Sequence, residues 1–205
     1  MPINLFVDLF RGGFNFFLAI LLVCCTYELD AQEIQFVRDR RLQATPESDR
    51  FWNSASQVSY PLAIGTPLVQ LGLGYRMKNK TWIQEGWQSV AGVALSAAMG
   101  YTMKETIRRN RPFIQDPTLQ PYQQETGYSF PSGTTTMAFT WATHLSLSVP
   151  KWYVAVPAYA VASGIGYSRI ALGAHYPTDV LAGAALGTGS AFVSRWLTQK
   201  IRFSK

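Results

Sequence analysis

His175 and Asp179, four residues apart in "AHYPTD", are well placed in this sequence for nucleophilic or acid–base chemistry. A carboxylate at that spacing can accept the imidazole Nδ1–H, which fixes the tautomer and leaves Nε2 unprotonated as a nucleophile or base. Pro177 and Thr178 suit the start of a helix. Taken alone, the pair is therefore also compatible with an aspartate that only caps a helix beside an unrelated histidine.

A basic stretch, "MKETIRRNRPF", is a candidate for phosphate binding. Lys104 and Arg111 are seven residues apart, which on one helix is about two turns and predicts that both cations share a face. Arg108 and Arg109 add positive charge, and Pro112 is expected to end the helix. A basic helix end is also typical of a solvated surface, so this stretch alone does not define a site.

The turn Pro131-Ser132-Gly133 opens an apolar helical run in "GYSFPSGTTTMAFTW", residues 127–141. Ser132 and the free backbone N–H groups of a new helix would converge on one point, an arrangement that favours an anion. Thr134 is the first residue after this turn.

The elements that must position these residues are predicted to be helices. Of the 205 residues, 48% are hydrophobic and 15% are charged, and the net charge is +6. None of the apolar segments alternates as a strand would, and all are rich in the small residues that let helices approach closely in lipid. The sequence therefore predicts an all-α bundle of five apolar helices, over about 54–75, 82–103, 133–149, 152–170 and 179–197.

The linkers between these segments fall into two kinds. If every segment crosses a bilayer, the varied linkers 104–131 and 171–178 share one side, and the positive-inside rule places the basic linkers in the cytoplasm. The candidate site is then extracytoplasmic, on the periplasmic side of a bacterial-type inner membrane. A soluble helical bundle with solvated basic side chains is the alternative. The basic side would carry Arg11, Arg76, Lys78, Lys80, Lys151, Arg195, Lys200, Arg202 and Lys205.

Residues 1–31 are predicted to be a secretory signal peptide or a retained signal anchor, because a basic flank precedes a short apolar run. Residues 32–52 are interpreted as a polar extracytoplasmic segment with room for one amphipathic helix, and residues 53–200 as the main domain. The two cysteines, Cys24 and Cys25, are adjacent, so no disulfide framework is expected.

Taken together, three motifs resemble a known pattern. Lys104-x6-Arg111-Pro112, Pro131-Ser132-Gly133 and Ser168-Arg169-x5-His175-x3-Asp179 are similar, in order and spacing, to the motifs of the type 2 phosphatidic acid phosphatase family. That family shares its core with bacterial acid phosphatases and vanadium haloperoxidases. The resemblance covers about residues 50–200.

The resemblance implies a helical bundle that hydrolyses phosphorylated lipids without a metal or other cofactor. His175 would attack phosphorus to give a phosphohistidine, and Asp179 would orient it. The phosphoryl oxygens would be bound by Lys104, Arg111, Ser132, Gly133 and Arg169. The expected partners are a membrane and a lipid phosphate of the polyprenyl diphosphate, phosphatidate or lipid A type, and no nucleic acid.

Thr134 departs from the family pattern, which has a histidine directly after Pro-Ser-Gly to protonate the leaving group. A threonine hydroxyl is too weak an acid to replace imidazolium near neutral pH. His144, ten residues further along the same predicted helix, is about 15 Å away and is interpreted as a buried or interfacial residue. Three interpretations remain: a phosphatase biased toward diphosphates, a slow enzyme or a variant altered at residue 134, and a non-catalytic binder of phosphorylated lipids.

Overall fold

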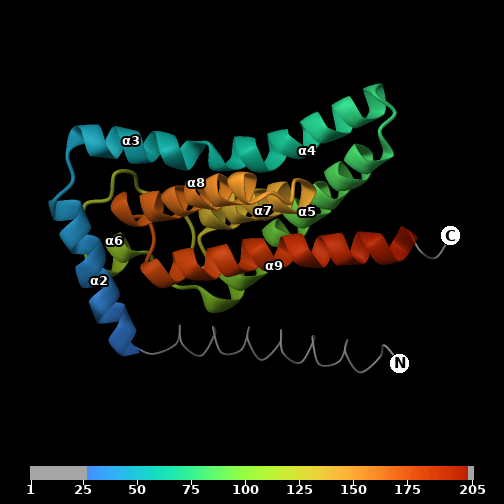
Figure 1. Ribbon diagram of the computed structural model, residues 1–205. Helices are drawn as coiled ribbons and strands as arrows, with labels where there is room; N and C mark the ends of the chain where they lie inside the picture. Colours follow the sequence, from blue (N-terminus) through green and yellow to red (C-terminus); the bar gives the residue numbers. More distant parts are fainter. Residues whose placement is uncertain (1–26, 203–205) are drawn as a thin grey trace.

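The computed structural model describes residues 27–202, and every regular element in that range is a helix (Figure 1). The all-α prediction is thereby confirmed. In chain order the helices are α2 (Tyr27–Leu42), α3 (Pro46–Gln57), α4 (Ser59–Arg76), α5 (Lys80–Ile107), the short α6 (Pro112–Gln115), α7 (Gly133–Ser148), α8 (Trp152–Ala171) and α9 (Pro177–Arg202).

Helix α7 lies in the middle of the bundle and packs against α4, α5, α8 and α9. Its contact with α8 is built from small side chains, Ala138 and Ala142 against Ala158 and Ala162. Its contact with α9 is closer still, because a Cβ atom on Gly187 would lie 2.2 Å from the carbonyl oxygen of Thr136. Close backbone approach therefore explains the small residues in these segments.

The N-terminal part of the described chain differs from the prediction. The sequence predicts a polar segment over 32–52 with room for one amphipathic helix; α2 agrees with that helix, but most of α3 is a second helix in the same range. Charged side chains of α2 reach distant partners, including a salt bridge between Arg38 and Asp116 in the α6–α7 linker. Apolar contacts add to these charges: Val37 of α2 is buried beside Leu119 and Ile170, and Trp52 of α3 packs edge-on against Tyr167 of α8.

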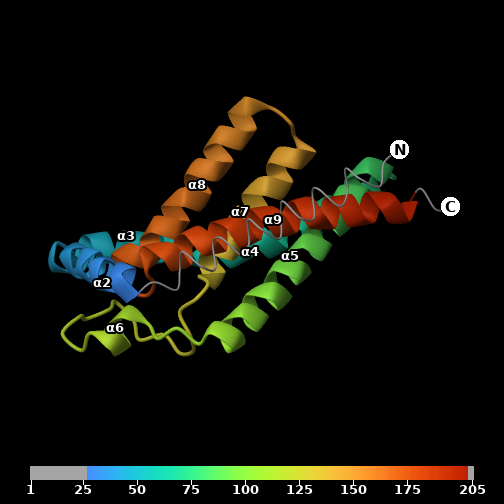
Figure 2. The same cartoon turned by 90° about the horizontal axis from the view of Figure 1, so that it is seen from below.

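The varied and the basic linkers lie at opposite ends of the bundle. In Figure 1, α6 and the α8–α9 turn are at one end, and the α4–α5 turn and the C-terminal end of α9 are at the other; Figure 2 shows the same separation from below. Between residues 27 and 202, no helix combines the length and apolar composition needed to cross a membrane. The predicted membrane crossings are therefore not confirmed, and most of the predicted signal or anchor lies outside the described residues.

Candidate active site

His175 lies in the turn that joins α8 to α9. Gly173 makes this turn possible, because its φ of +74° is a left-handed conformation that other residues rarely adopt. The backbone N–H groups of Ala174 and His175 then donate to the carbonyl oxygen of Arg169, at 3.0 and 3.2 Å. The turn thus holds Arg169 and His175, six residues apart in sequence, at one site.

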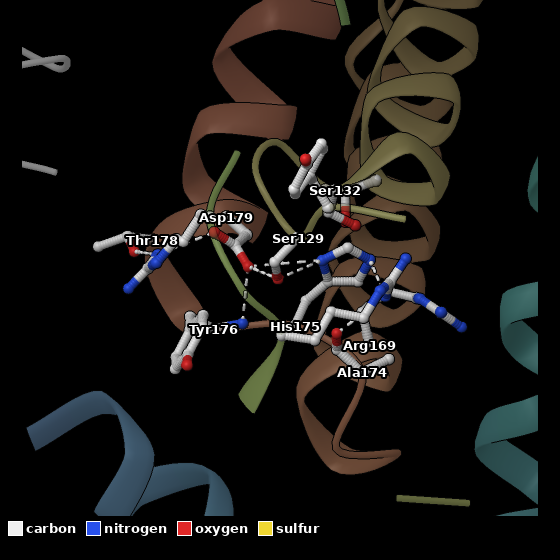
Figure 3. Close-up of polar contacts among 12 residues, drawn as sticks. Ser129, Ser132, Arg169, Ala174, His175, Tyr176, Thr178 and Asp179 are labelled. Atoms are coloured by element: carbon white, nitrogen blue, oxygen red, sulfur yellow. Dashed lines mark hydrogen bonds and ion pairs between the residues drawn. The ribbon is translucent and has the colours of Figure 1, made fainter. Parts of the chain in front are cut away.

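Asp179 orients His175 and also caps α9. Its Oδ2 lies 3.4 Å from His175 Nδ1 and accepts the backbone N–H of Tyr176 at 3.0 Å. The structure therefore brings the two residues together, and Asp179 caps the helix without being unrelated to the histidine. Ser129 lies between the two side chains (Figure 3): its hydroxyl donates to Asp179 Oδ2, and its Oγ is 3.3 Å from His175 Nδ1.

The neighbours of the imidazole define its tautomer. Nε2 lies 3.3 Å from Arg111 Nη1, and a guanidinium can only donate, so Nε2 must carry a lone pair and Nδ1 the proton. The ring is buried, and this desolvation lowers the pKa of His175 to about 4 despite the neighbouring carboxylate of Asp179. At neutral pH His175 is therefore uncharged, with Nε2 available for nucleophilic attack.

Arg109 and Glu33 support this pair from the other side. Arg109 Nη1 lies 2.8 Å from Asp179 Oδ1, and Arg109 Nη2 lies 2.7 Å from Glu33 Oε2. Glu33, in α2, also accepts the backbone N–H of Thr178 at 2.7 Å. The sequence predicted only added positive charge from Arg109, whereas the structure uses it to neutralise the fully buried Asp179.

The predicted phosphate ligands Arg111 and Arg169 lie close together on the Nε2 side of the imidazole, away from Asp179 (Figure 3). Both are buried, and both contact one carboxylate, that of Glu125. Arg111 is held by the carbonyl oxygens of Gly127 and Ala174, each at 3.0 Å. Arg169 Nε is buried and has no hydrogen-bond partner within the part of the chain that the structure describes. A buried donor of this kind is a candidate contact for a bound anion.

Lys104 approaches the same cluster, but not as predicted. Helix α5 ends at Ile107, Arg108 adopts a left-handed conformation with φ 51°, and Arg111 is the extended N-cap of α6. The prediction that Lys104 and Arg111 lie on one helix face is therefore wrong; the chain turns between them. Lys104 Nζ donates to the carbonyl oxygen of Tyr128 at 2.6 Å, and burial followed by the charge of Arg111 lowers its pKa to about 8.

The Pro-Ser-Gly turn is placed over His175 and Asp179 by α9. Ser132 N–H donates to the carbonyl oxygen of Asp179 at 3.0 Å, and a Cβ atom on Gly183 would lie 2.7 Å from Ser132 O. Ser132 is the N-cap residue of α7, so Gly133 and Thr134 form its first turn. The start of α7 at the Pro-Ser-Gly turn therefore lies beside the candidate site.

The threonines after this turn have different surroundings. Thr135 donates to Ser132 Oγ at 2.9 Å, and Thr136 donates to Ser132 O at 2.9 Å. Both are buried, whereas Thr134 is half-buried and its carbonyl oxygen accepts from the hydroxyl of Ser59. The two buried threonines brace Ser132, and Thr134 lies in the first turn of α7 beside it.

His144 is remote from this chemistry. It is 6% exposed in the middle of α7, where its Nε2 lies 3.4 Å from Ser194 Oγ of α9. The prediction that His144 is buried is confirmed.

Comparison with known proteins identifies the class to which this fold and this site belong. A model described as the PAP2 superfamily matches residues 85–203, more than half of the chain. The chain belongs to the PAP2 superfamily.

Individual relatives agree with this assignment. A lipid A 1-phosphatase from Porphyromonas gingivalis is 34% identical over 154 residues, which cover 74% of this chain and 32% of that protein. An undecaprenyl-diphosphatase from Sulfolobus acidocaldarius is 34% identical over 106 residues, 51% of each chain. The chain thus spans about a third and about half of the lengths of these two relatives.

A solved structure agrees in fold. The crystal structure of a transmembrane PAP2-type phosphatidylglycerolphosphate phosphatase from Bacillus subtilis matches with a TM-score of 0.75 and 24% identity, covering 93% of this chain and 96% of that one.

Proposed function

We propose that this protein is a metal-independent lipid phosphatase that hydrolyses a phosphate or diphosphate ester through a phosphohistidine on His175. The observation that carries the proposal is the orientation of His175. Its Nδ1 faces Asp179, and its unprotonated Nε2 faces the buried cluster of Arg111 and Arg169. A nucleophile oriented by a carboxylate and directed at an anion-binding cluster is the arrangement that phosphoryl transfer requires.

In the first step, the Nε2 lone pair attacks phosphorus and the bond to the leaving oxygen breaks. Arg111, Arg169 and Lys104 stabilise the charge on the equatorial oxygens, together with Ser132 and the Gly133 N–H. Asp179 stabilises the imidazolium that forms. In the second step, water attacks phosphorus and loses a proton to solvent, the N–P bond breaks, inorganic phosphate leaves, and neutral His175 is regenerated. The three cations supply the charge neutralisation, so the mechanism needs no cofactor.

Thr134 limits which leaving groups depart easily. An alkoxide from a lipid monoester needs a proton as it leaves, whereas a phosphate leaving from a diphosphate is already a weak base. Loss of a general acid costs about 10²- to 10⁴-fold in rate. We therefore expect diphosphates to be the better substrates, and Thr134 is also the observation that favours a second candidate function, a non-catalytic binder of phosphorylated lipids.

The substrate is proposed to be a phosphorylated lipid, because the relatives are named for action on lipid A and undecaprenyl diphosphate. The direct test is phosphate release from a polyprenyl diphosphate, a phosphatidate and a lipid A phosphate, with the His175→Ala protein as the blank. Faster release from the diphosphate would support the proposal. Binding of these lipids without release of phosphate would favour the second candidate.

Association with a membrane is proposed from the surface of the bundle. Large apolar side chains are exposed along α4, α8 and α9, and a surface of this kind marks contact with lipid or with another protein. The end of the bundle that carries the candidate site faces the extracytoplasmic side in this proposal, because the basic linkers lie at the opposite end. The exposed side chains include Ile64, Leu68, Val69, Leu73, Val156, Val161, Leu181, Phe192, Val193 and Leu197.

Cysteine labelling tests both the membrane and the orientation. In a protein with Cys24 and Cys25 replaced by serine, Gln123→Cys lies on the exposed linker before α7 and Lys151→Cys lies at the exposed start of α8. On intact cells, an impermeant thiol reagent should label Gln123→Cys and not Lys151→Cys. The opposite pattern would reverse the orientation, and recovery of the protein without detergent would exclude membrane association.

The pH dependence of kcat/KM should show an alkaline limb near pH 8. Lys104 must be charged to hold a phosphoryl oxygen, and its lowered pKa of about 8 means that this charge is lost as pH rises through that value. His175, with a lowered pKa of about 4, stays neutral across this range and cannot produce the limb. In Lys104→Arg the alkaline limb should move to higher pH, because arginine remains protonated. An unmoved limb would show that another group titrates there.

A further inference from the structure

Glu125, in the linker between α6 and α7, contacts both arginines of the proposed phosphate site. Its Oε2 lies 2.9 Å from Arg111 Nη1, and its Oε1 forms a second salt bridge with Arg169 Nη2. Carboxylates and phosphoryl groups both present paired anionic oxygens to the planar fork of a guanidinium. Glu125 therefore holds the arginine groups that the substrate phosphate would use.

Glu125 is the movable member of this group. The side chains of Arg111 and Arg169 are 5% and 6% exposed, whereas that of Glu125 is 32% exposed. Its neighbours Gln123, Gln124 and Thr126 are also exposed, so the Glu125 side chain can rotate toward solvent while the carbonyl oxygens of Thr126 and Gly127 stay on Arg111. Burial alone would raise the pKa of Glu125, but the charge of Arg169 and its hydrogen bond outweigh this effect and hold the pKa below its ordinary value.

The carboxylate leaves part of the site unsatisfied. It accepts from one nitrogen of Arg169, Nη2, while Nε of the same side chain is buried without a hydrogen-bond partner among the described residues. A phosphoryl group has three oxygens and carries a charge of about −1.5 to −2 at pH 7, against −1 for a carboxylate. A terminal phosphate can therefore satisfy more of these donors than Glu125 does.

We propose that Glu125 is an internal competitor that sets the affinity threshold of the Arg111–Arg169 site, so that terminal phosphate groups bind and phosphodiester head groups do not. This inference rests on the proposed function, because it assumes that the two arginines bind the phosphoryl group. A tethered carboxylate competes at an effective concentration in the millimolar range or above. A monoanionic diester offers no more charge than Glu125, whereas a phosphate dianion does.

The threshold matters at a lipid surface. Phosphodiester head groups are the common anions of phospholipids, and without a competitor they would occupy the guanidinium groups of Arg111 and Arg169. Displacement of Glu125 weakens every ligand by the same factor, which is the reciprocal of the fraction of time that the site is open. A weakly held diester then falls below useful occupancy, while a strongly held dianion does not. Return of Glu125 would also help to expel the product, inorganic phosphate.

The test compares the binding of two small anions by calorimetry in detergent: inorganic phosphate, and dimethyl phosphate as a diester. Glu125→Gln should bind phosphate roughly tenfold more tightly than the wild type and should gain measurable affinity for dimethyl phosphate. Glu125→Asp, whose shorter side chain cannot span both arginines, should change in the same direction and serves if Glu125→Gln does not fold. Glu105→Gln, which removes an exposed glutamate in the last turn of α5, is the matched control and should bind as the wild type does.

The Arg169→Ala variant tests the proposed phosphate site separately from the competitor role of Glu125. If this variant loses phosphate binding and Glu125→Gln binds phosphate no more tightly than the wild type, the site stands and the competitor role is refuted. Glu125 would then organise the arginines instead of competing with the substrate. If Arg169→Ala binds phosphate as the wild type does, the proposed phosphate site itself is wrong. An adventitious contact of Glu125 in the free protein would also leave affinity unchanged in Glu125→Gln, and so would overturn the proposal.

Discussion

Replacement of His175 by alanine is expected to reduce phosphate release by about 10⁴-fold or more, for every substrate that the wild type hydrolyses. The reason is that no other group in the described site has an unprotonated nitrogen facing Arg111 and Arg169. The loss should appear in kcat, because the arginines still bind the phosphoryl group. Phosphate binding measured by calorimetry should therefore survive in His175→Ala.

The chain provides a matched control, since His175 and His144 are its two histidines. His144 is buried between α7 and α9, away from the site, so His144→Gln should keep its activity once its folding has been checked. Equal loss in both variants would indicate general damage to the fold. Full activity in His175→Ala would exclude the proposed nucleophile.

Placing a general acid at residue 134 is expected to raise the rate of monoester hydrolysis strongly. Thr134→His should accelerate hydrolysis of lipid phosphate monoesters by about 10²-fold or more, while diphosphate hydrolysis should change much less. The position suits the change, because Thr134 is half-buried in the first turn of α7, next to Ser132 and Gly133. The measurement is the ratio of kcat values for a monoester and a diphosphate in the two proteins.

The double variant with His175→Ala should remain inactive, because an acid cannot help when no nucleophile attacks. If Thr134→His gains nothing on any monoester although phosphate still binds, the defect lies beyond the missing proton. The non-catalytic binder of phosphorylated lipids would then be the better description of this protein.

The helices that carry the site could be predicted well where local sequence determines them. The predicted segments 133–149 and 152–170 correspond to α7 (Gly133–Ser148) and α8 (Trp152–Ala171). Glycine and proline at their boundaries and small residues along their length are local signals. Helix α3 also had a local signal that was missed: Thr45 and Ser48 form a capping box around Pro46.

The supporting residues of the site could not be predicted, because their roles depend on contacts between distant parts of the chain. Ser129 reaches Asp179 across 50 positions, and Glu33 reaches Arg109 across 76. Glu125 resembles any glutamate of a polar linker until the fold brings two buried arginines to it. The path of the chain after α5 was wrongly predicted for a related reason, since the left-handed Arg108 breaks the assumed helix.

The central claim, that His175 becomes phosphorylated, is tested most directly by trapping the intermediate. In the proposed mechanism, a general acid at residue 134 would protonate the leaving group in the first step and then act as the base that activates water in the second. Threonine does neither, so hydrolysis of the phosphohistidine should be slow as well. With an aryl phosphate, whose leaving group needs no proton, the wild type should show a burst of aryl alcohol close to one equivalent per site. Rapid quenching with labelled phosphate ester should place an alkali-stable, acid-labile phosphoryl group on His175. Steady turnover with neither a burst nor label on His175 would contradict the proposed mechanism.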